Sequence, residues 1–311
     1  MISLLDQLTK QLNSLSDTPA LDAQVLLAHI TQKERAWILA HPELELSSAQ
    51  EKMLSKSLAQ LKENVPLPYV IGHWEFFGMD FIVSPDVLIP RPETEELVER
   101  ALSWLRANNK KDVLDVGTGS GCIPISIARN APTSTKLSTG DLSLIGVDLS
   151  SAALDIARQN AERHANRHTL KGTGGAESAE NVLSSPREIW QIGNSAIQFQ
   201  QSDLLANLPL ATFDLITANL PYIPSQTLQS LDVYTREPIL ALDGGADGLD
   251  LVQRLLADAP RYLAPEGLIL LEIDSSHGEA ALKLANDFFP EAENELIEDL
   301  SGRDRFISIQ N

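Results

Sequence analysis

The stretch DVLDVGTGSG at residues 112–121, followed by CIPISIARN at residues 122–130, decides the fold. It begins with the apolar pattern of a buried strand, and CIPISIARN has the pattern of a helix. Between strand and helix lies a Gly-x-Gly-x-Gly turn. Glycine permits positive φ angles and close approach of a ligand, and the free N–H groups at the start of the next helix face that ligand. In a doubly wound α/β sheet, such a turn marks the binding crevice at the carboxyl ends of the strands.

The rest of this half of the chain repeats the alternation of strand and helix. Short apolar runs, most of them followed by a helical pattern, are VLDVG (113–117), SLIGVD (143–148), AIQFQ (196–200), FDLITAN (213–219) and GLILLEI (267–273). This alternation predicts a parallel sheet with helices on both faces. Two further candidates, 295–300 and 305–309, are separated by the turn-forming SGRD, which predicts an antiparallel pair. We therefore expect an α/β fold with a mixed, mostly parallel sheet.

Other patterns precede and interrupt this α/β domain. Helical spacing of apolar residues predicts a small helical domain at residues 1–65. Residues 66–92 include GHWEFFGMDFIVSPDVLIPRP, in which aromatic and β-branched residues flank Gly78, and they predict a β-hairpin linker. The α/β domain then occupies residues 93–311. Within it, residues 164–195 include HTLKGTGGAESAENVLSSP, whose Gly, Ser and Ala content without periodicity predicts a loop insertion outside the core.

Composition excludes several classes of protein. The 311 residues include 24 basic and 43 acidic side chains, a formal net charge of -19 that would repel a phosphate backbone and argues against direct nucleic-acid binding. No apolar run approaches the about 20 residues that span a bilayer, and the first residues lack a signal-peptide pattern. We expect a cytoplasmic monomer without membrane contact. The single Cys122 cannot form an internal disulfide, and no His/Cys spacing predicts a metal site.

A carboxylate that binds ribose hydroxyls is expected at the end of the second strand, about 20 residues after the glycines. Asp141 has this spacing, but it precedes the apolar run SLIGV. Asp148 follows the run and is expected to project from its carboxyl end toward the crevice, so we choose Asp148. The loop residues of APTSTKLSTGD explain the longer spacing. The alternative is that Asp148 caps the next helix together with Ser150 and Ser151.

The fourth predicted strand ends in Asn219-Leu220-Pro221-Tyr222, beside the glycine turn. One reaction that such a site could catalyse is methyl transfer to a planar amide or amino nitrogen. This nitrogen is a poor nucleophile because its lone pair is delocalised. The side-chain carbonyl of Asn219 and the main-chain carbonyl of Leu220 can accept hydrogen bonds from its two N–H groups and so direct the nitrogen toward a sulfonium methyl group. Pro221 fixes the turn, and Tyr222 offers an aromatic wall. The alternative is a strand-ending turn without chemistry.

Stretches along nearly the whole chain resemble the protein-(glutamine-N5) methyltransferases of the PrmC/HemK family, which modify peptide chain release factors. They are PLPYVIGHWEFFGMDFIVSPDVLIPRPETEELVE (66–99), LDVGTGSGCIPISIA (114–128), FDLITANLPYIP (213–224), EPILALDGGADGL (237–249), LLEI (270–273) and DLSGRDRF (299–306). The resemblance implies a helical domain that docks the release factor, followed by a Rossmann-like class I methyltransferase domain. It implies S-adenosylmethionine-dependent methylation of the glutamine in a Gly-Gly-Gln motif, which supports translation termination.

The resemblance also implies roles for individual residues. The implied cofactor site consists of Gly117, Thr118, Gly119, Ser120 and Gly121 at the methionine part, Asp148 at the ribose, Asp203 and Leu204 near the adenine, and Asn219. The implied catalytic residues are Asn219, Pro221 and Tyr222, which bind the substrate amide together with Leu220. Two residues depart from the family pattern. Leu220 replaces the first proline of Asn-Pro-Pro-Tyr, and Leu204 stands where the family often has an aromatic residue.

Three alternatives remain open at this point. Asn-Leu-Pro-Tyr also resembles the signature of ribosomal RNA adenine-N6 methyltransferases, in which the same residues hold a flipped adenine. The charge of -19 and the absence of a basic stripe argue against this reading. A binding module that has lost turnover is a second alternative, suggested by Leu204 and Leu220. A nicotinamide-dependent dehydrogenase is a third.

Overall fold

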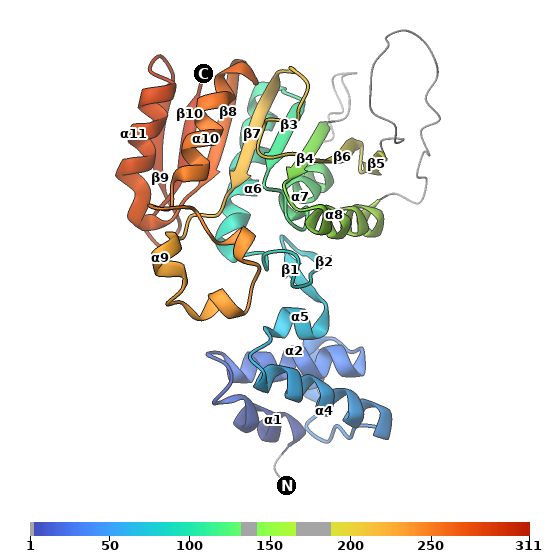
Figure 1. Ribbon diagram of the computed structural model, residues 1–311. Helices are drawn as coiled ribbons and strands as arrows, with labels where there is room; N and C mark the ends of the chain where they lie inside the picture. Colours follow the sequence, from blue (N-terminus) through green and yellow to red (C-terminus); the bar gives the residue numbers. More distant parts are fainter. Residues whose placement is uncertain (1–2, 132–141, 166–187) are drawn as a thin grey trace. The chain divides into compact units, whose positions relative to one another are not determined.

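The computed structural model describes residues 3–131, 142–165 and 188–311 (Figure 1). The chain forms two compact units, Met1–His73 and Trp74–Asn311. In the described part of the chain, no helix combines the length and the apolar character needed to cross a membrane.

The first unit is helical, as the sequence predicts. Its helices are α1 (Leu4–Leu12), α2 (Pro19–Thr31), α3 (Arg35–Ala40), α4 (Ser48–Lys62) and α5 (Leu67–Ile71). Side chains cap two of them. Ser3 accepts a hydrogen bond from the N–H of Asp6 at the start of α1, and Ser47 and Gln50 form a reciprocal capping box at the start of α4. Fully or nearly fully buried apolar side chains of this unit include Leu8, Leu12, Leu26, Leu27, Ile30 and Ile38.

The β-hairpin predicted at residues 66–92 is shorter than expected. Strands β1 (His73–Phe76) and β2 (Met79–Ile82) pair in a separate two-stranded sheet. The connecting residues Phe77 and Gly78 have φ angles of 54° and 70°, the left-handed values that a tight hairpin turn requires. The hairpin therefore accounts for only the middle of the predicted linker.

Helices occupy the two ends of the predicted linker for local reasons. Helix α5 ends at Gly72, whose φ of 80° allows its N–H to return to the carbonyl of Pro68. After the hairpin, Pro92 opens helix α6 (Pro92–Asn108), because proline in the first turn of a helix loses no hydrogen bond. The aromatic and β-branched residues of this segment favour strands, so the sequence pattern indicates neither the end of α5 at Ile71 nor the start of α6 at Pro92.

The second unit is built on an eight-stranded sheet with the order β5-β6-β4-β3-β7-β8-β10-β9. Its strands are β3 (Asp112–Val116), β4 (Ser143–Asp148), β5 (Trp190–Ile192), β6 (Ser195–Gln201), β7 (Phe213–Asn219), β8 (Leu263–Glu272), β9 (Glu293–Glu298) and β10 (Asp304–Gln310). Strands β6, β4, β3, β7 and β8 run parallel, whereas β5 and β10 run antiparallel to their neighbours. This confirms the predicted mixed, mostly parallel sheet and its antiparallel pair near the C-terminus.

Helices cover both faces of this sheet, as predicted (Figure 1). One apolar cluster joins the sheet to α6, α7 (Cys122–Asn130) and α8 (Ser151–His164). The other joins it to α10 (Asp250–Asp258) and α11 (Gly278–Phe288). Successive side chains of β3 enter opposite clusters, because neighbouring residues of a strand point to opposite faces.

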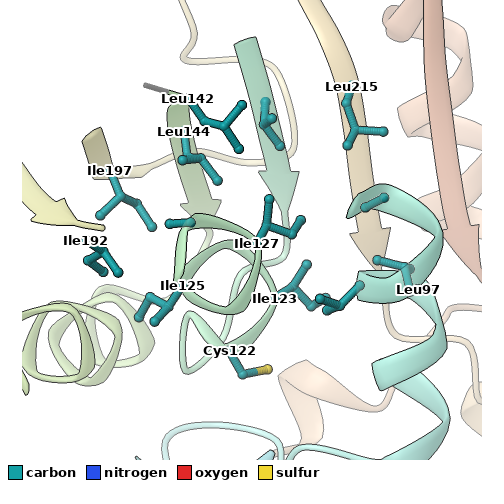
Figure 2. Packing of buried hydrophobic residues seen from close by; sticks show 14 of the residues in the cluster. Leu97, Cys122, Ile123, Ile125, Ile127, Leu142, Leu144, Ile192, Ile197 and Leu215 are labelled. Atoms are coloured by element: carbon teal, nitrogen blue, oxygen red, sulfur yellow. The ribbon is translucent and has the colours of Figure 1, made fainter. Parts of the chain in front are cut away.

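Figure 2 shows the first cluster around α7. Ile123, Ile125 and Ile127 of α7 are buried against side chains from neighbouring elements, among them Leu97 of α6 and Leu144 of β4. Each such side chain contributes about 1.5–3 kcal/mol when it leaves water. Because α7 follows the glycine turn directly, this packing fixes the turn at the carboxyl end of β3.

Short elements complete the second unit. They are α9 (Ser225–Leu228) and the 3-10 turns η1 (Asp232–Thr235), η2 (Ile239–Ala241), η3 (Ala259–Arg261) and η4 (Ser275–His277). The connection from β7 to α10 contains α9, η1 and η2, and it contributes Ser225 and residues 238–241 to the pocket described below.

The loop insertion predicted at residues 164–195 is wrong at its C-terminal end. Strand β5 lies within it, and Trp190 and Ile192 are buried in the first apolar cluster. The strand pairs antiparallel with β6 and forms an edge of the sheet. A strand of three residues is too short to show a period in the sequence. Residues 166–187, and Asp141 that competes with Asp148, lie outside the described residues.

Candidate active site

A pocket of about 870 Å³ lies at the carboxyl ends of the parallel strands of the second unit. The predicted site residues that line it are Gly117, Thr118, Gly119, Ser120, Asp148, Asp203, Leu204, Asn219, Leu220 and Pro221. Of the remaining predicted residues, Gly121 and Tyr222 follow directly in the chain but do not line the pocket. The structure thus brings together residues from the ends of β3, β4, β6 and β7, as expected for a sheet of this type.

The glycine turn is held by its own backbone. The N–H groups of Gly117 and Thr118 both donate to the carbonyl of Val147, each at 2.9 Å. Gly121 has a φ of 77° and caps the N-terminus of α7. A Cβ atom there would lie 3.1 Å from Ile125 and 3.2 Å from Phe199, so packing as well as conformation favours glycine.

Asp148 lies at the end of β4 beside this turn. Its Oδ2 accepts from the N–H of Gly119 and its Oδ1 from the N–H of Ser150, each at 2.8 Å. Burial raises the pKa of the Asp148 carboxyl, and these N–H groups partly oppose the rise. An ionised carboxylate has about four acceptor sites, so capacity remains for hydroxyl groups of a ligand. The N-cap of α8 is Ser150, whose side chain accepts from the N–H of Ala153, so Asp148 itself does not cap the helix.

A second acid, Asp115, is buried beneath the glycine turn. Its Oδ1 accepts from the hydroxyl of Thr217 at 2.7 Å. Burial raises the pKa of Asp115 to about 6, while the nearby hydroxyl groups of Thr118 and Thr217 oppose the rise. In the sequence Asp115 only precedes the glycines, and the structure gives it a polar role inside the sheet.

Asp203 and Leu204 line the pocket after the end of β6. Leu204 has a φ of 48°, which is uncommon for a residue with a side chain, and it packs against the second apolar cluster. Asp203 forms an ion pair with Arg254 of α10 at 2.8 Å, in which both side chains are about half exposed. Arg254 also lines the pocket, and no sequence pattern indicates it.

Asn219 ends β7 and is partly buried at the pocket wall. Its Nδ2 donates to the hydroxyl of Thr94 at 3.0 Å. Glu272, the last residue of β8, is paired with Asn219 in the register of the two strands and is only 2% exposed. Burial raises the pKa of Glu272 to about 7, while the nearby polar side chains of Thr94 and Asn219 lower it.

The residues after Asn219 form a compact turn. Leu220 is buried at the pocket wall, against Gly117 of the glycine turn. Tyr222 is largely buried, and burial together with the charge of Glu272 raises the pKa of its hydroxyl to about 12. It therefore lies near the carboxylate behind the pocket wall rather than on the wall itself.

A glycine-rich loop at residues 243–248 packs against this turn, and Asp243 and Gly245 of the loop also line the pocket. The N–H of Ile223 donates to the carbonyl of Leu242, and the N–H of Gly244 donates to the carbonyl of Ile223. A Cβ atom on Gly244 would lie 2.7 Å from the carbonyl oxygen of Pro221, and one on Gly248 would overlap the carbonyl oxygen of Tyr222. The loop can approach this closely only because these positions have no side chain.

An ion pair joins two segments of the chain that line the pocket. Arg91 pairs with Glu237, which also accepts from the N–H of Ile89 at 3.2 Å. Arg91 lines the pocket, and so do Ile239 and Leu240, which follow Glu237 in the chain. Ile239 and Leu240 are exposed, so they give this part of the pocket an apolar surface open to solvent.

The residues of the site that are not predicted from the sequence include Thr94, Glu272, Arg254 and Glu237. Signals exist for two of them. Thr94 lies in the stretch IPRPETE, and Glu272 closes the apolar run of the fifth predicted strand at its carboxyl end. A charged residue at that position of a buried parallel strand faces the same edge of the sheet as Asn219.

Comparisons with known proteins agree with this arrangement. Residues 3–72 match the model of the PrmC N-terminal domain family. A release factor glutamine methyltransferase of Moorella thermoacetica is 35% identical, over 93% of this chain and 90% of that protein. The chain belongs to the release factor glutamine methyltransferase family. The relative of the same name from Coxiella burnetii is also 35% identical, over 89% of this chain and 87% of that protein.

A solved structure of a release factor-specific methyltransferase is also similar to this chain. The protein-(glutamine-N5) methyltransferase (release factor-specific) of Alicyclobacillus acidocaldarius is 28% identical, with a TM-score of 0.39, over 74% of this chain and 99% of that chain. Membership in the release factor glutamine methyltransferase family confirms the resemblance drawn from the sequence stretches. It also confirms that the chain is a methyltransferase rather than a dehydrogenase.

Proposed function

We propose that this protein transfers a methyl group from S-adenosylmethionine to the side-chain amide nitrogen of the glutamine in the Gly-Gly-Gln motif of a peptide chain release factor. This modification would support translation termination. The observation that carries the proposal is the position of Asn219, which lies in the wall of the same pocket as the glycine turn and Asp148, in a chain of this family.

The pocket has the features that S-adenosylmethionine requires. Its volume of about 870 Å³ is within the usual range for a pocket that holds a small molecule. The glycine turn brings main-chain atoms to the wall, and the Asp148 carboxylate retains acceptor capacity for ribose hydroxyls. Leu204 offers an apolar contact for the adenine, with Asp203 beside it. When bound, the cofactor supplies a methyl group on a positively charged sulfur.

The substrate amide would be held by Asn219 and Leu220. The side-chain oxygen of Asn219 and the main-chain oxygen of Leu220 accept the two N–H bonds of the glutamine amide. Both hydrogen bonds strengthen as positive charge builds on the nitrogen, so they stabilise the transition state more than the ground state. The methylated nitrogen is strongly acidic and loses a proton to water, so no general base is needed beforehand. Pro221 restricts the turn that presents the Leu220 carbonyl.

The proposal extends to the partner and its recognition. The substrate is a protein, and residues 3–72, which match the PrmC N-terminal domain, help to dock it. The net charge of -19 favours recognition without direct nucleic-acid contact. We propose that the protein acts in the cytoplasm and that it is a monomer. Analytical sedimentation at the assay concentration tests the oligomeric state directly.

Mass spectrometry of the Gly-Gly-Gln peptide tests the proposed reaction. An unmethylated release factor is incubated with the protein and S-adenosylmethionine. We expect one added methyl on the glutamine amide, lost in Asn219→Ala and retained in Asn108→Ala, a matched change at an exposed asparagine of α6. An unmodified glutamine together with methylated ribosomal RNA would instead support the adenine-N6 alternative. Cofactor binding without transfer to either substrate would support a binding module.

A further inference from the structure

The orientation of the Asn219 side-chain amide decides whether the substrate can bind as proposed above. One end of this amide accepts hydrogen bonds and the other donates them. The substrate amide needs an acceptor, so Oδ1 must be available to it. The structure directs Nδ2 toward Thr94, at 3.0 Å from its hydroxyl, which leaves Oδ1 as the available acceptor.

Thr94 alone cannot impose this orientation. A threonine hydroxyl both donates and accepts, so it could equally donate to Oδ1 of a reversed amide. Glu272 removes the ambiguity, because an ionised carboxylate only accepts. Glu272 is paired with Asn219 in the register of β7 and β8, and Thr94 and Asn219 both lower its pKa, so the negative carboxylate favours the N–H and O–H groups of these side chains over their oxygens. A Thr94 hydroxyl whose proton turns toward Glu272 can only accept from Asn219.

The burial of Glu272 and Thr94 is consistent with a role in orienting the Asn219 side chain. Glu272 is 2% exposed and Thr94 is 3% exposed, and Oε2 of Glu272 has no hydrogen-bond partner in the part of the chain that the structure describes. Burying a carboxylate whose oxygens are not all hydrogen-bonded costs folding free energy, so the presence of Glu272 at this position calls for an explanation. Glu272 does not line the pocket, so it acts through Asn219 rather than on the substrate.

We propose that Glu272 and Thr94 are positioning residues that hold the Asn219 side chain with Nδ2 turned inward and Oδ1 presented to the substrate amide. This inference rests on the proposed glutamine methylation, since it concerns the group that binds the glutamine. It assigns a role to two residues from α6 and β8, elements that contribute neither the glycine turn nor Asp148.

The charge state of Glu272 makes the proposal testable by pH. Burial is the largest cause that raises its pKa, to about 7; the nearby charge of Arg305 on β10 lowers it, and that of Glu93 on α6 raises it. Tyr222 and Cys122 also face it, but their own pKa values are raised to about 12, so they stay neutral near pH 7. When Glu272 is protonated it can donate to Thr94, and the inward orientation of Nδ2 is no longer enforced. Activity should therefore fall as the pH drops through about 7.

The first test is Glu272→Gln, which preserves shape but removes the acceptor-only group. We expect kcat for release factor methylation to fall at least about tenfold, as for other small misplacements of a reacting group. S-adenosylmethionine affinity, measured by calorimetry, should stay within about twofold, because this side chain does not line the pocket. The acidic limb of the pH–rate profile near pH 7 should disappear. Glu295→Gln, at an exposed glutamate of β9, is the matched control and should behave as the wild type.

The second test keeps the proposal falsifiable if Glu272→Gln fails to fold. Thr94→Val has the same shape but no hydroxyl and should lose kcat to a similar extent, while Thr94→Ser should restore most of the rate. If both Glu272→Gln and Thr94→Val keep the wild-type kcat, or if Glu272→Gln keeps the acidic limb, the proposal is wrong. Equal loss in Thr94→Val and Thr94→Ser would show a packing role and would also overturn it. Wild-type protein that leaves the glutamine unmodified would instead refute the proposed function itself.

Discussion

Asp148 shows how a single carboxylate can serve both the fold and a ligand. Each of its oxygens already accepts one main-chain N–H, from Gly119 and from Ser150. Asp148→Asn would replace one oxygen by an NH₂ group that faces one of these N–H donors. It would also weaken the acceptor for the ribose. Hydrogen bonds to a charged group contribute about 1.5–3 kcal/mol, so we expect S-adenosylmethionine affinity to fall roughly 10- to 100-fold. Isothermal titration calorimetry measures this directly.

The matched control for this change is Asp155→Asn on α8. Asp155 is exposed and pairs with Arg158, three residues along the same helix, so its removal should leave the cofactor affinity unchanged. Equal S-adenosylmethionine affinity in the wild type and in Asp148→Asn would contradict the ribose-binding role of Asp148, and a neighbouring residue would then have to bind the ribose.

Residues at the ends of strands are the most predictable part of the site. The apolar run before Asp148 favours it over Asp141, and the structure places Asp148 at the pocket. The same pattern identifies Asn219. Thr94 escapes prediction because it contacts Asn219 across 125 residues of sequence, and no local pattern records such a contact. Only the fold brings the start of α6 to the end of β7.

Among the elements of the second unit, the turn after β7 depends on the glycine-rich loop at residues 243–248 that packs against it. Gly248 has a φ of 85°, and a Cβ atom there would overlap the carbonyl oxygen of Tyr222 and lie 2.6 Å from the ring of His277. Gly248→Ala must therefore displace the turn or the loop. We expect a destabilisation of roughly 2–5 kcal/mol, from left-handed strain and overpacking together. The methylation rate should fall more than the cofactor affinity, because the displaced turn carries Asn219 and Leu220. Thermal unfolding and steady-state kinetics measure the two effects.

Gly78→Ala separates strain from displacement. Gly78 has a similar φ of 70°, but a Cβ atom there would meet no atom within 4 Å beyond its immediate chain neighbours. We expect only the strain of about 1–2 kcal/mol and an unchanged rate. Equal effects of the two changes on rate would show that the loop does not shape the turn.

Elements with long periodic patterns are predictable from the sequence, and short ones are not. The parallel strands and α7 have apolar runs that only a buried strand or helix explains. Strand β5 and helix α5 have three and five residues, and each owes its structure to its neighbours. Trp190 and Ile192 become a strand because β6 offers an unpaired edge and an apolar cluster to fill, which the sequence of that segment does not reveal.

For the whole molecule, the buried acids Asp115 and Glu272 give stability an unusual dependence on pH. Burial raises their pKa values to about 6 and about 7, so the folded state binds protons that the unfolded state, with ordinary carboxyl pKa values, does not. Their contribution to stability is fully present below the unfolded pKa and is lost as the pH rises through about 6 to 7. The acids with lowered pKa values, Asp214, Asp274 and Asp299, titrate below this range. His164, whose pKa burial lowers, acts in the opposite direction.

We therefore expect the free energy of unfolding to increase when the pH is lowered from 8 to 6, by roughly half a kcal/mol from Asp115 and about 1 kcal/mol from Glu272, less the His164 contribution. Denaturant unfolding at several pH values measures it. Glu272→Gln and Asp115→Asn should each flatten the dependence, and Glu295→Gln should not. The rate of methylation should change in the opposite direction, because protonated Glu272 no longer orients Asn219. A rate that falls with acid while stability rises cannot be explained by unfolding, whereas a parallel fall of both would refute the link between Glu272 and the active site.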